Sequence, residues 1–150
     1  MLGKLQRPEI EKVLEQQVIG RIGCYASGTV YIVPISYAYD GKYIYGRTHE
    51  GLKIDIMRKN PEVCFEVDII ERMSKWKSVI AWGRFNELHE GELRTEALNK
   101  LMARQLPLVT SERVLLSSVW PFNPNETEAI EGVVYRIKLG EKTGRFETDE

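Results

Sequence analysis

The sequence predicts a mainly β protein, with six antiparallel strands and three short helices that close most easily into a small barrel. Two observations predict this class. Runs rich in Tyr, Val and Ile follow one another, and the pairs Ser27-Gly28 and Asp40-Gly41 separate the first three runs as hairpin turns do. The last run, residues 132–139, alternates between an apolar set of side chains and a largely polar one, which is the period of a strand.

The elements can be placed in order along the chain. Residues 8–18 are expected to form an amphipathic helix, because Pro8 suits its first position and apolar residues recur at helical spacing. A second, short helix ends before Pro61, and a third with a clear apolar stripe covers residues 91–105. The strands are expected at residues 21–27, 29–40, 42–46, 63–70, 75–88 and 132–139.

Length and composition indicate one domain. The chain has 150 residues, of which 43% are hydrophobic, so it can bury a core without disulfide bonds. No internal repeat, low-complexity segment or linker divides it, and we expect a single domain over residues 1–150. The 21 Lys and Arg residues nearly balance the 22 Asp and Glu residues. This balance excludes a general basic surface that would attract nucleic acid or anionic lipid, so any anion site must be local.

The cysteines and the apolar segments indicate the compartment. Cys24 and Cys64 lie in apolar strand-like segments without a paired spacing, which fits buried free thiols in a reducing environment. The N-terminus has no apolar signal-like segment, and no apolar run is long enough to span a membrane. We therefore expect a cytoplasmic protein with no nucleic-acid or membrane partner.

Pro34 stands inside the predicted strand 29–40. Both alternating sets of side chains in this strand are largely apolar, so we expect both of its faces to be covered. Proline removes one ladder donor and is usually confined to an edge or a bulge. Two interpretations stay open: a bulge at the split of the barrel, or an interrupted ladder that leaves main-chain groups of residues 33–36 free for a flat polar ligand.

The start of the second helix carries positive charge, with Lys53 in its first turn and Arg47 and His49 just before it. A cation there faces the positive end of the helix dipole, a cost of about 0.3 to 1 kcal/mol that Glu50 offsets in part. Thr48 stands where a helix N-cap would stand. One interpretation is a capped surface helix with a solvated lysine. The other is an anion site, with phosphate as the natural ligand, because the N–H groups and the cations would then all attract it.

Three tryptophans and seven tyrosines are many for one small domain. Core packing accounts for some of them. Trp82 shares a strand face with Ser78, and Trp120 precedes Pro121 in a long segment before the last strand. A tryptophan beside proline in such a segment often packs against another surface, such as a partner subunit or a planar ring.

These features occur together in a known family. The segment GTVYIVPISYAYDGKYIYGRTHEGLKIDIMRKNPEVCFEVD, followed by SVIAWGRFNEL and VVYRIKLGEKTGRFE, resembles the FMN-binding split-barrel family, the pyridoxamine 5'-phosphate oxidase-like superfamily. The resemblance covers almost the whole chain, from Glu9 to Phe146. It implies a six-stranded antiparallel Greek-key split barrel with short flanking helices. It also implies a homodimer that binds one FMN in each of two clefts lined by both subunits.

The resemblance assigns cofactor roles to residues of this chain. The segment that matches residues 31–36 runs under the flavin ring and offers it main-chain groups. Arg47, Thr48 and Lys53 match the segment that holds the FMN phosphate, and Ser78 stands where the family often turns a polar side chain toward the flavin. The cofactor-binding residues that we expect are Val33, Pro34, Ile35, Ser36, Arg47, Thr48, Lys53, Ser78, Trp82 and Trp120, the last of them across the dimer interface.

Departures from the family pattern limit the expected chemistry. True pyridoxamine 5'-phosphate oxidases usually end in an Arg-Leu-x-Pro-like tail, whereas this chain ends in GRFETDE, so we do not expect that activity. Nitroimidazole-reductase-like relatives carry a flavin-side histidine at the position of Gly46, and His49 lies three residues later. His89 is expected as a surface turn residue. Two histidines and two separated cysteines assemble no catalytic triad and no metal-ligand cluster, so no catalytic residue is assigned.

The leading functional hypothesis is an FMN-dependent oxidoreductase that passes electrons from a reduced nicotinamide, NAD(P)H, to a small planar acceptor. The alternative from a different class is a non-catalytic flavin-binding carrier or sensor. A more distant alternative keeps the fold and changes the ligand to haem or a deazaflavin, as in some relatives of the family. The sequence offers no obvious axial histidine for haem.

Overall fold

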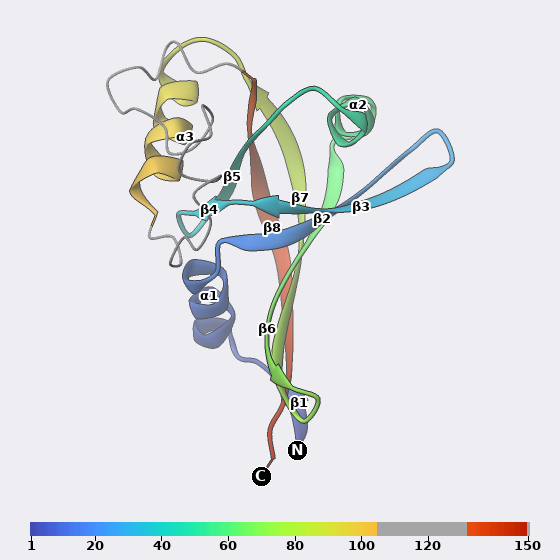
Figure 1. The fold of residues 1–150 in the computed structure, drawn as a ribbon, viewed down its shortest axis with the longest axis vertical. Coiled ribbons are helices and arrows are strands. Elements are labelled where there is room, and N and C mark those ends of the chain that lie inside the picture. The colour runs from blue at the N-terminus through green and yellow to red at the C-terminus, as the bar shows by residue number, and fades with distance from the viewer. Residues whose placement is uncertain (105–131, 150) are drawn as a thin grey trace, which may run out of the picture.

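The computed structural model describes residues 1–104 and 132–149, which form one antiparallel sheet with helices packed around it (Figure 1). The helices are α1 (Arg7–Gln16), α2 (Leu52–Lys59) and α3 (Glu92–Ala103). The strands are β1 (Leu2–Lys4), β2 (Ile19–Ala26), β3 (Thr29–Ser36), β4 (Ala38–Tyr39), β5 (Tyr43–Thr48), β6 (Glu62–Arg72), β7 (Lys75–Leu88) and β8 (Val133–Glu147). Within the described ranges, no helix has the length and apolar character needed to cross a membrane.

The strands follow the order β3-β2-β6-β7-β8-β5-β4, and β1 pairs with β8 outside this path. Every pair is antiparallel. Ser27 and Gly28, with φ values of 51° and 81°, make the two-residue turn between β2 and β3 that their composition predicted. The predicted antiparallel, mainly β class is therefore confirmed.

The predicted closed barrel of six strands is not found. The described residues contain eight strands, and the ends of the sheet path, β3 and β4, do not pair with each other. The predicted strand 29–40 is interrupted at Tyr37, whose N–H donates to the Val18 carbonyl at 2.9 Å and whose hydroxyl donates to the Leu14 carbonyl at 2.8 Å. These bonds turn Tyr37 toward α1 and divide the predicted strand into β3 and β4, which lie at the two ends of the sheet path.

The chain termini add strand structure that the sequence did not predict. β8 continues to Glu147 because β7 pairs with it along most of its length and β1 pairs with its last residues. This pairing between distant segments holds the polar sequence GEKTGRFE extended, and its local pattern does not signal a strand. By contrast, β7 has the predicted bounds, Lys75–Leu88, because its alternation is clear from the sequence.

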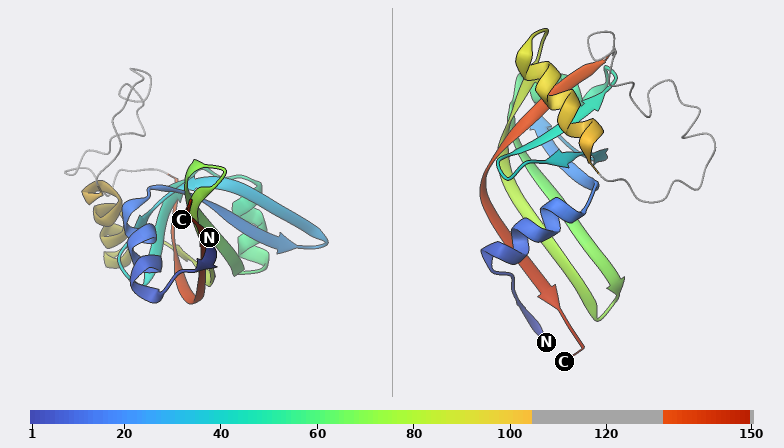
Figure 2. Two further views of the ribbon diagram at one scale, coloured as in Figure 1. Left: turned by 90° about the horizontal axis from the view of Figure 1, so that it is seen from below. Right: turned by 90° about the vertical axis from the view of Figure 1, so that its left-hand side faces the viewer.

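Two hydrophobic clusters form the core. The larger one contains residues of α1, α2 and the sheet, with Tyr37 and Phe65 in edge-to-face contact at 4.9 Å between ring centroids. The smaller one joins α3 to β5 and β8 through Leu98, Tyr45 and Val134. α1 and α2 therefore pack on the face of the sheet that carries the larger cluster, and α3 packs on the opposite face, against β5 and β8. Figure 2 shows the three helices around the coiled sheet.

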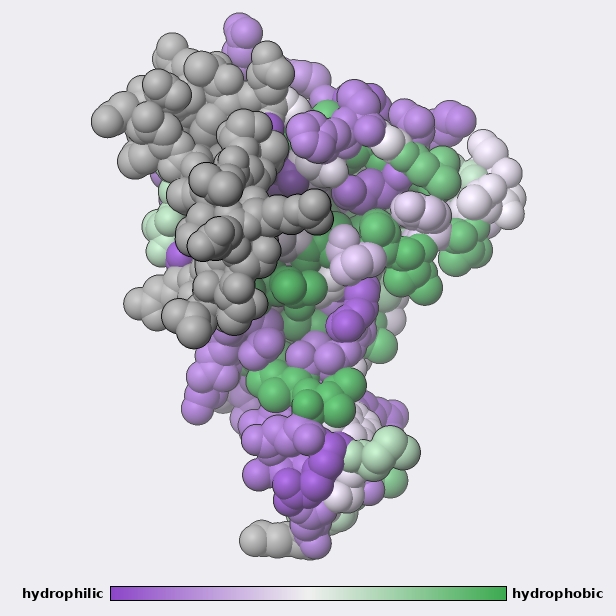
Figure 3. Space-filling view, viewed as in Figure 1, coloured by the Kyte–Doolittle hydropathy of each residue, from purple (hydrophilic) through white to green (hydrophobic). Residues whose placement is uncertain are grey.

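One face of β2, β3, β6 and β7 carries exposed apolar side chains. Val30 and Ile32 on β3 are 72% and 70% exposed, and Trp82 on β7 is 44% exposed. Figure 3 shows hydrophobic residues at the surface near the β2–β3 hairpin. The expectation that both faces of the strand around Pro34 are covered is therefore wrong for the single chain.

Candidate functional site

Lys53 and Thr48 meet at the start of α2. The Lys53 ammonium donates a hydrogen bond of 2.8 Å to the Thr48 hydroxyl, which ties the first turn of the helix to the end of β5. Thr48 was expected to cap the helix, and this is wrong, because Gly51 is the N-cap and no side chain accepts from the first helical N–H groups. The start of α2 therefore presents uncapped N–H donors beside a hydroxyl and an ammonium.

Lys53 is a half-buried cation. Burial lowers its pKa, because the ammonium loses hydration there, and the neighbouring Cys24 acts in the opposite direction. In the described part of the chain, no carboxylate forms an ion pair with Lys53. A partly desolvated ammonium without a counter-ion is unfavourable, and an anion bound beside it would remove that cost. The burial of Lys53 thus favours the anion site over the solvated surface lysine.

A short series of contacts connects Lys53 to β3. Its ammonium lies near the thiol of Cys24 on β2, and Cys24 Sγ donates a weak hydrogen bond to the Tyr31 carbonyl, 3.7 Å away. Tyr31 begins the segment whose main chain was predicted to face a flat ligand. The predicted phosphate region and the predicted ring region are therefore neighbours in the fold.

The edge position of β3 explains Pro34. This residue pairs in register with Arg21 of β2, and the β2–β3 ladder has no register shift, so a bulge is not the reason for the proline. Val33 and Ile35 turn toward the core, whereas Pro34 and Ser36 are exposed. On the side of β3 away from β2, the main-chain groups have no ladder partner among the described residues. They remain available to a planar ligand.

Arg47 lies on the opposite face of β5 from Thr48. It precedes Thr48 on β5, and adjacent side chains of a strand point to opposite faces. Its guanidinium lies beside Gly132, where a Cβ atom would come within 3.3 Å of Nη2. The role of Arg47 in holding phosphate stays a prediction.

Ser78 and Trp82 form a second group on the exposed face of β7, with β6 and β2 between them and β3. The Ser78 hydroxyl donates to Glu66 Oε2 at 3.0 Å. Trp82 lines a shallow groove of about 450 Å³ whose other walls include Val30 and Ile32. The groove wall also includes Cys24, so this residue of β2 lies between the Trp82 group and Lys53.

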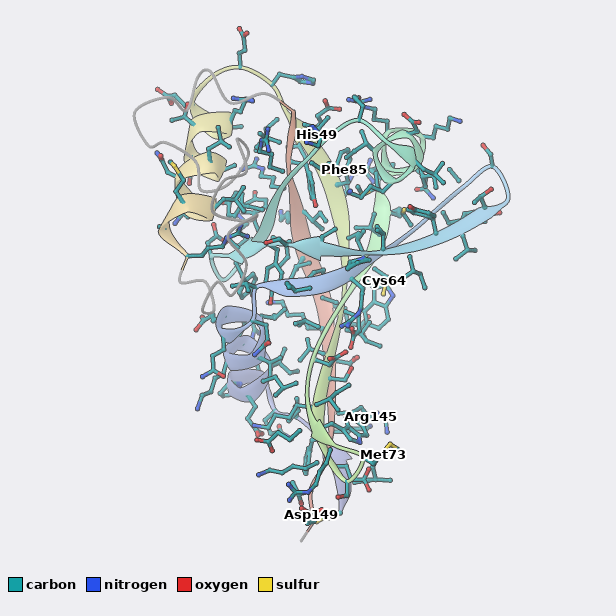
Figure 4. The ribbon with its side chains drawn as sticks, viewed as in Figure 1. His49, Cys64, Met73, Phe85, Arg145 and Asp149 are labelled. Atoms are coloured by element: carbon teal, nitrogen blue, oxygen red, sulfur yellow. The ribbon has the colours of Figure 1, made fainter. Side chains whose placement is uncertain are left out.

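The remaining predicted positions have separate outcomes. Trp120 lies outside the described residues. A Cβ atom at Gly46 would lie 2.9 Å from Cε1 of the buried Tyr135 and closer still to the tip of the ring, so a histidine cannot stand there unless Tyr135 moves. His49, which Figure 4 labels near the loop that enters α2, is exposed. His89 is exposed after the end of β7, as predicted.

Sequence reasoning missed a charged group on the exposed face of the sheet. Arg21 donates to Glu66 at 3.3 Å and to Asp68 at 3.1 Å, so two carboxylates of β6 share one guanidinium. Burial raises the pKa of Glu66, Asp68 adds to this shift, and Arg21 opposes it. The spacing of Glu66 and Asp68 was the available signal, because residues two apart in a strand share a face.

Comparison with known proteins gives a consistent result. Residues 6–146 match the family described as pyridoxamine 5'-phosphate oxidase. The crystal structure of a FAD-binding protein from Mesorhizobium loti is 28% identical, with a TM-score of 0.76 and 99% of each chain covered. The FAD-binding protein from Mycobacterium smegmatis shares the fold at 22% identity, with a TM-score of 0.65 and 97% of this chain and 98% of that chain covered.

A curated sequence relative covers a shorter segment. An uncharacterized protein of Rhizobium meliloti (strain 1021) is 37% identical over 84 residues, which are 56% of this chain and 56% of that protein. The match therefore spans little more than half the length of this relative.

Proposed function

The chain belongs to the pyridoxamine 5'-phosphate oxidase family, and on this basis we propose that it binds FMN, one per chain, with the phosphate at the start of α2. The proposed activity is that of an oxidoreductase that passes electrons from a reduced nicotinamide to a small planar acceptor. The observation that carries the proposal is the half-buried Lys53, which is bonded to a hydroxyl and has no ion-pair partner among the described residues. A terminal phosphate would supply the missing negative charge.

The groups at this site suit a phosphate monoester. Lys53, Thr48 and the uncapped N–H groups of α2 would hold the phosphate, and the free edge of β3 would offer main-chain groups to the ring. These groups suit one terminal phosphate, and on that ground we propose FMN, whereas the two relatives named above are FAD-binding proteins. The bound flavin supplies the hydride chemistry, whereas this chain supplies binding, orientation and electrostatics.

The exposed apolar face supports a homodimer. Val30, Ile32 and Trp82 expose apolar surface beside a groove, and such a surface marks an interaction site. A second copy of the chain would cover this face. It would also bring its own Ser78 and Trp82 toward the flavin of the first copy.

The absorption spectrum of the purified protein tests the proposal. Bands of oxidised flavin are expected, and anaerobic mixing with NADH or NADPH should bleach them. A protein that binds flavin and is reduced by neither donor would support the carrier or sensor alternative. A colourless protein that also fails to bind added FMN would contradict the proposal.

A further inference from the structure

Arg58 binds two carboxylates that come from different parts of the chain. Its Nε and Nη2 donate to Glu87 on β7 at 2.7 and 2.9 Å. Its Nη1 donates to both carboxylate oxygens of Glu50 at 2.5 and 3.1 Å. The first pair of bonds is bidentate and fixes the plane of the guanidinium, which leaves its other edge for Glu50.

The position of Arg58 on α2 explains its reach. Arg58 lies in the last turn of α2, and long side chains of a helix point back toward its N-terminus. Glu50 lies just before the N-cap Gly51, at the end of the helix toward which Arg58 extends. The contact therefore fixes the Glu50 side chain along the helix, on the side of β7.

The negative charge of Glu50 affects the proposed phosphate site because Glu50 lies close to Lys53 along the chain. Glu50 lies just before the N-cap and three residues before Lys53, so the two Cα atoms are at most about 11 Å apart, a separation that a released glutamate and a lysine side chain can span together. Such a pair would neutralise the cation and place a negative charge where a phosphate is proposed to bind. Like charges at one site oppose each other, so a free Glu50 would weaken phosphate binding.

We propose that Arg58 is a positioning residue of the anion site, which keeps the Glu50 carboxylate away from Lys53 while α2 receives a phosphate. This inference rests on the proposed function, because it assumes that the flavin phosphate binds at Lys53. Arg58 itself does not touch the ligand. Its role is to hold a competing anion.

Four variants test this role: Arg58→Gln, Glu50→Gln, the double variant, and Arg72→Gln as a matched control. Arg72 is an exposed arginine at the end of β6 that pairs with Asp149 near the C-terminus. Apo-protein is titrated with FMN and, separately, with riboflavin, which lacks the phosphate. We expect Arg58→Gln to weaken FMN about tenfold and the double variant to return to within about twofold of the parent protein. Riboflavin affinity should not change in any of them.

The outcomes separate this inference from the proposed function. Equal loss of FMN affinity in Arg58→Gln and in the double variant would overturn the inference, because it indicates a structural role. Equal loss for FMN and riboflavin would overturn it as well. If replacing Lys53 weakens FMN and Arg58→Gln does not, the inference fails and the proposed function stands. If the unmodified protein binds no FMN, both fail.

A second substitution covers the case in which Arg58→Gln does not fold. Arg58→Lys keeps the charge and offers no planar fork for two carboxylates. It should weaken FMN in the same direction, and adding Glu50→Gln should restore the affinity. A lysine variant with the affinity of the parent protein would overturn the inference.

Discussion

Replacing Lys53 with methionine tests the phosphate site, because methionine keeps much of the apolar stem and removes the charge. A hydrogen bond to a charged group contributes about 1.5 to 3 kcal/mol, so the affinity for FMN should fall by roughly 10- to 150-fold. Riboflavin, which has no phosphate, should bind the variant and the parent protein equally well.

The same substitution that weakens FMN binding should not reduce the stability of the apo-protein. It removes the 2.8 Å bond to Thr48, a loss of about 1 kcal/mol, and it also removes a partly desolvated charge, so the apo fold should be nearly as stable or slightly more stable. The pKa of Lys53 is lower in the folded chain than its usual 10.5, so the unfolded chain holds more protons between these two values. Apo stability should therefore rise with pH in that window, and the methionine variant should lose this rise. Urea unfolding at about pH 7 and about pH 10 measures it.

The assay for the ligand is a titration of apo-protein followed by quenching of flavin fluorescence. Lys59→Met serves as the control, because Lys59 is an exposed residue at the far end of the same helix. Equal FMN affinities for Lys53→Met and the parent protein would refute the reasoning. Equal losses for FMN and riboflavin would refute it too, because the effect would then not depend on the phosphate.

Three further predictions concern the fold and the assembly. Gly46→Ala should destabilise the protein by about 1 to 3 kcal/mol, because a Cβ there overlaps the buried Tyr135 ring; an unchanged urea midpoint would contradict this packing. Ile32→Lys should yield a monomer of 17.3 kDa in light scattering where the parent protein gives twice that mass, and a persistent dimer would place the interface elsewhere. Glu11→Gln should cost about 1 to 3 kcal/mol at neutral pH, because Lys142, whose side chain is 13% exposed, loses its carboxylate partner. Burial acts to raise the pKa of Glu11, but its contact with Lys142 helps to lower it overall. The stabilisation by the ion pair should therefore be complete above pH 4.5 and should fade as the pH falls through the folded pKa of Glu11. A difference in stability between the variant and the parent protein that does not change with pH would contradict the ion pair.

The sequence predicted elements whose pattern is local. β7 has the predicted bounds because apolar and polar residues alternate along it, and the turn at Ser27 and Gly28 is set by two residues that accept positive φ. β1 and the end of β8 were missed because they pair with each other across almost the whole length of the chain. The break at Tyr37 was missed for the same reason, since the partners that turn it lie in α1 and just after it.

In the candidate site too, the residues with a local sequence signal were predicted and those that depend on distant contacts were not. Lys53 and Thr48 were predicted from charge and spacing near one helix start, and the structure joins them directly. The proximity of Cys24 to Lys53 and the bonds from Arg58 to Glu87 were not predicted, because each depends on contacts between elements distant in sequence. The exposed apolar face of β3 also could not be read from the sequence, because an apolar strand face looks the same whether its cover is in the same chain or in another one.

The central claim is that the start of α2 holds the phosphate of one FMN per chain. Heating the purified protein releases any non-covalent flavin, which chromatography can identify and quantify against FMN, FAD and riboflavin standards. The account predicts FMN at one equivalent per chain. Release of FAD, or a protein that carries no flavin and does not take up added FMN, would contradict it.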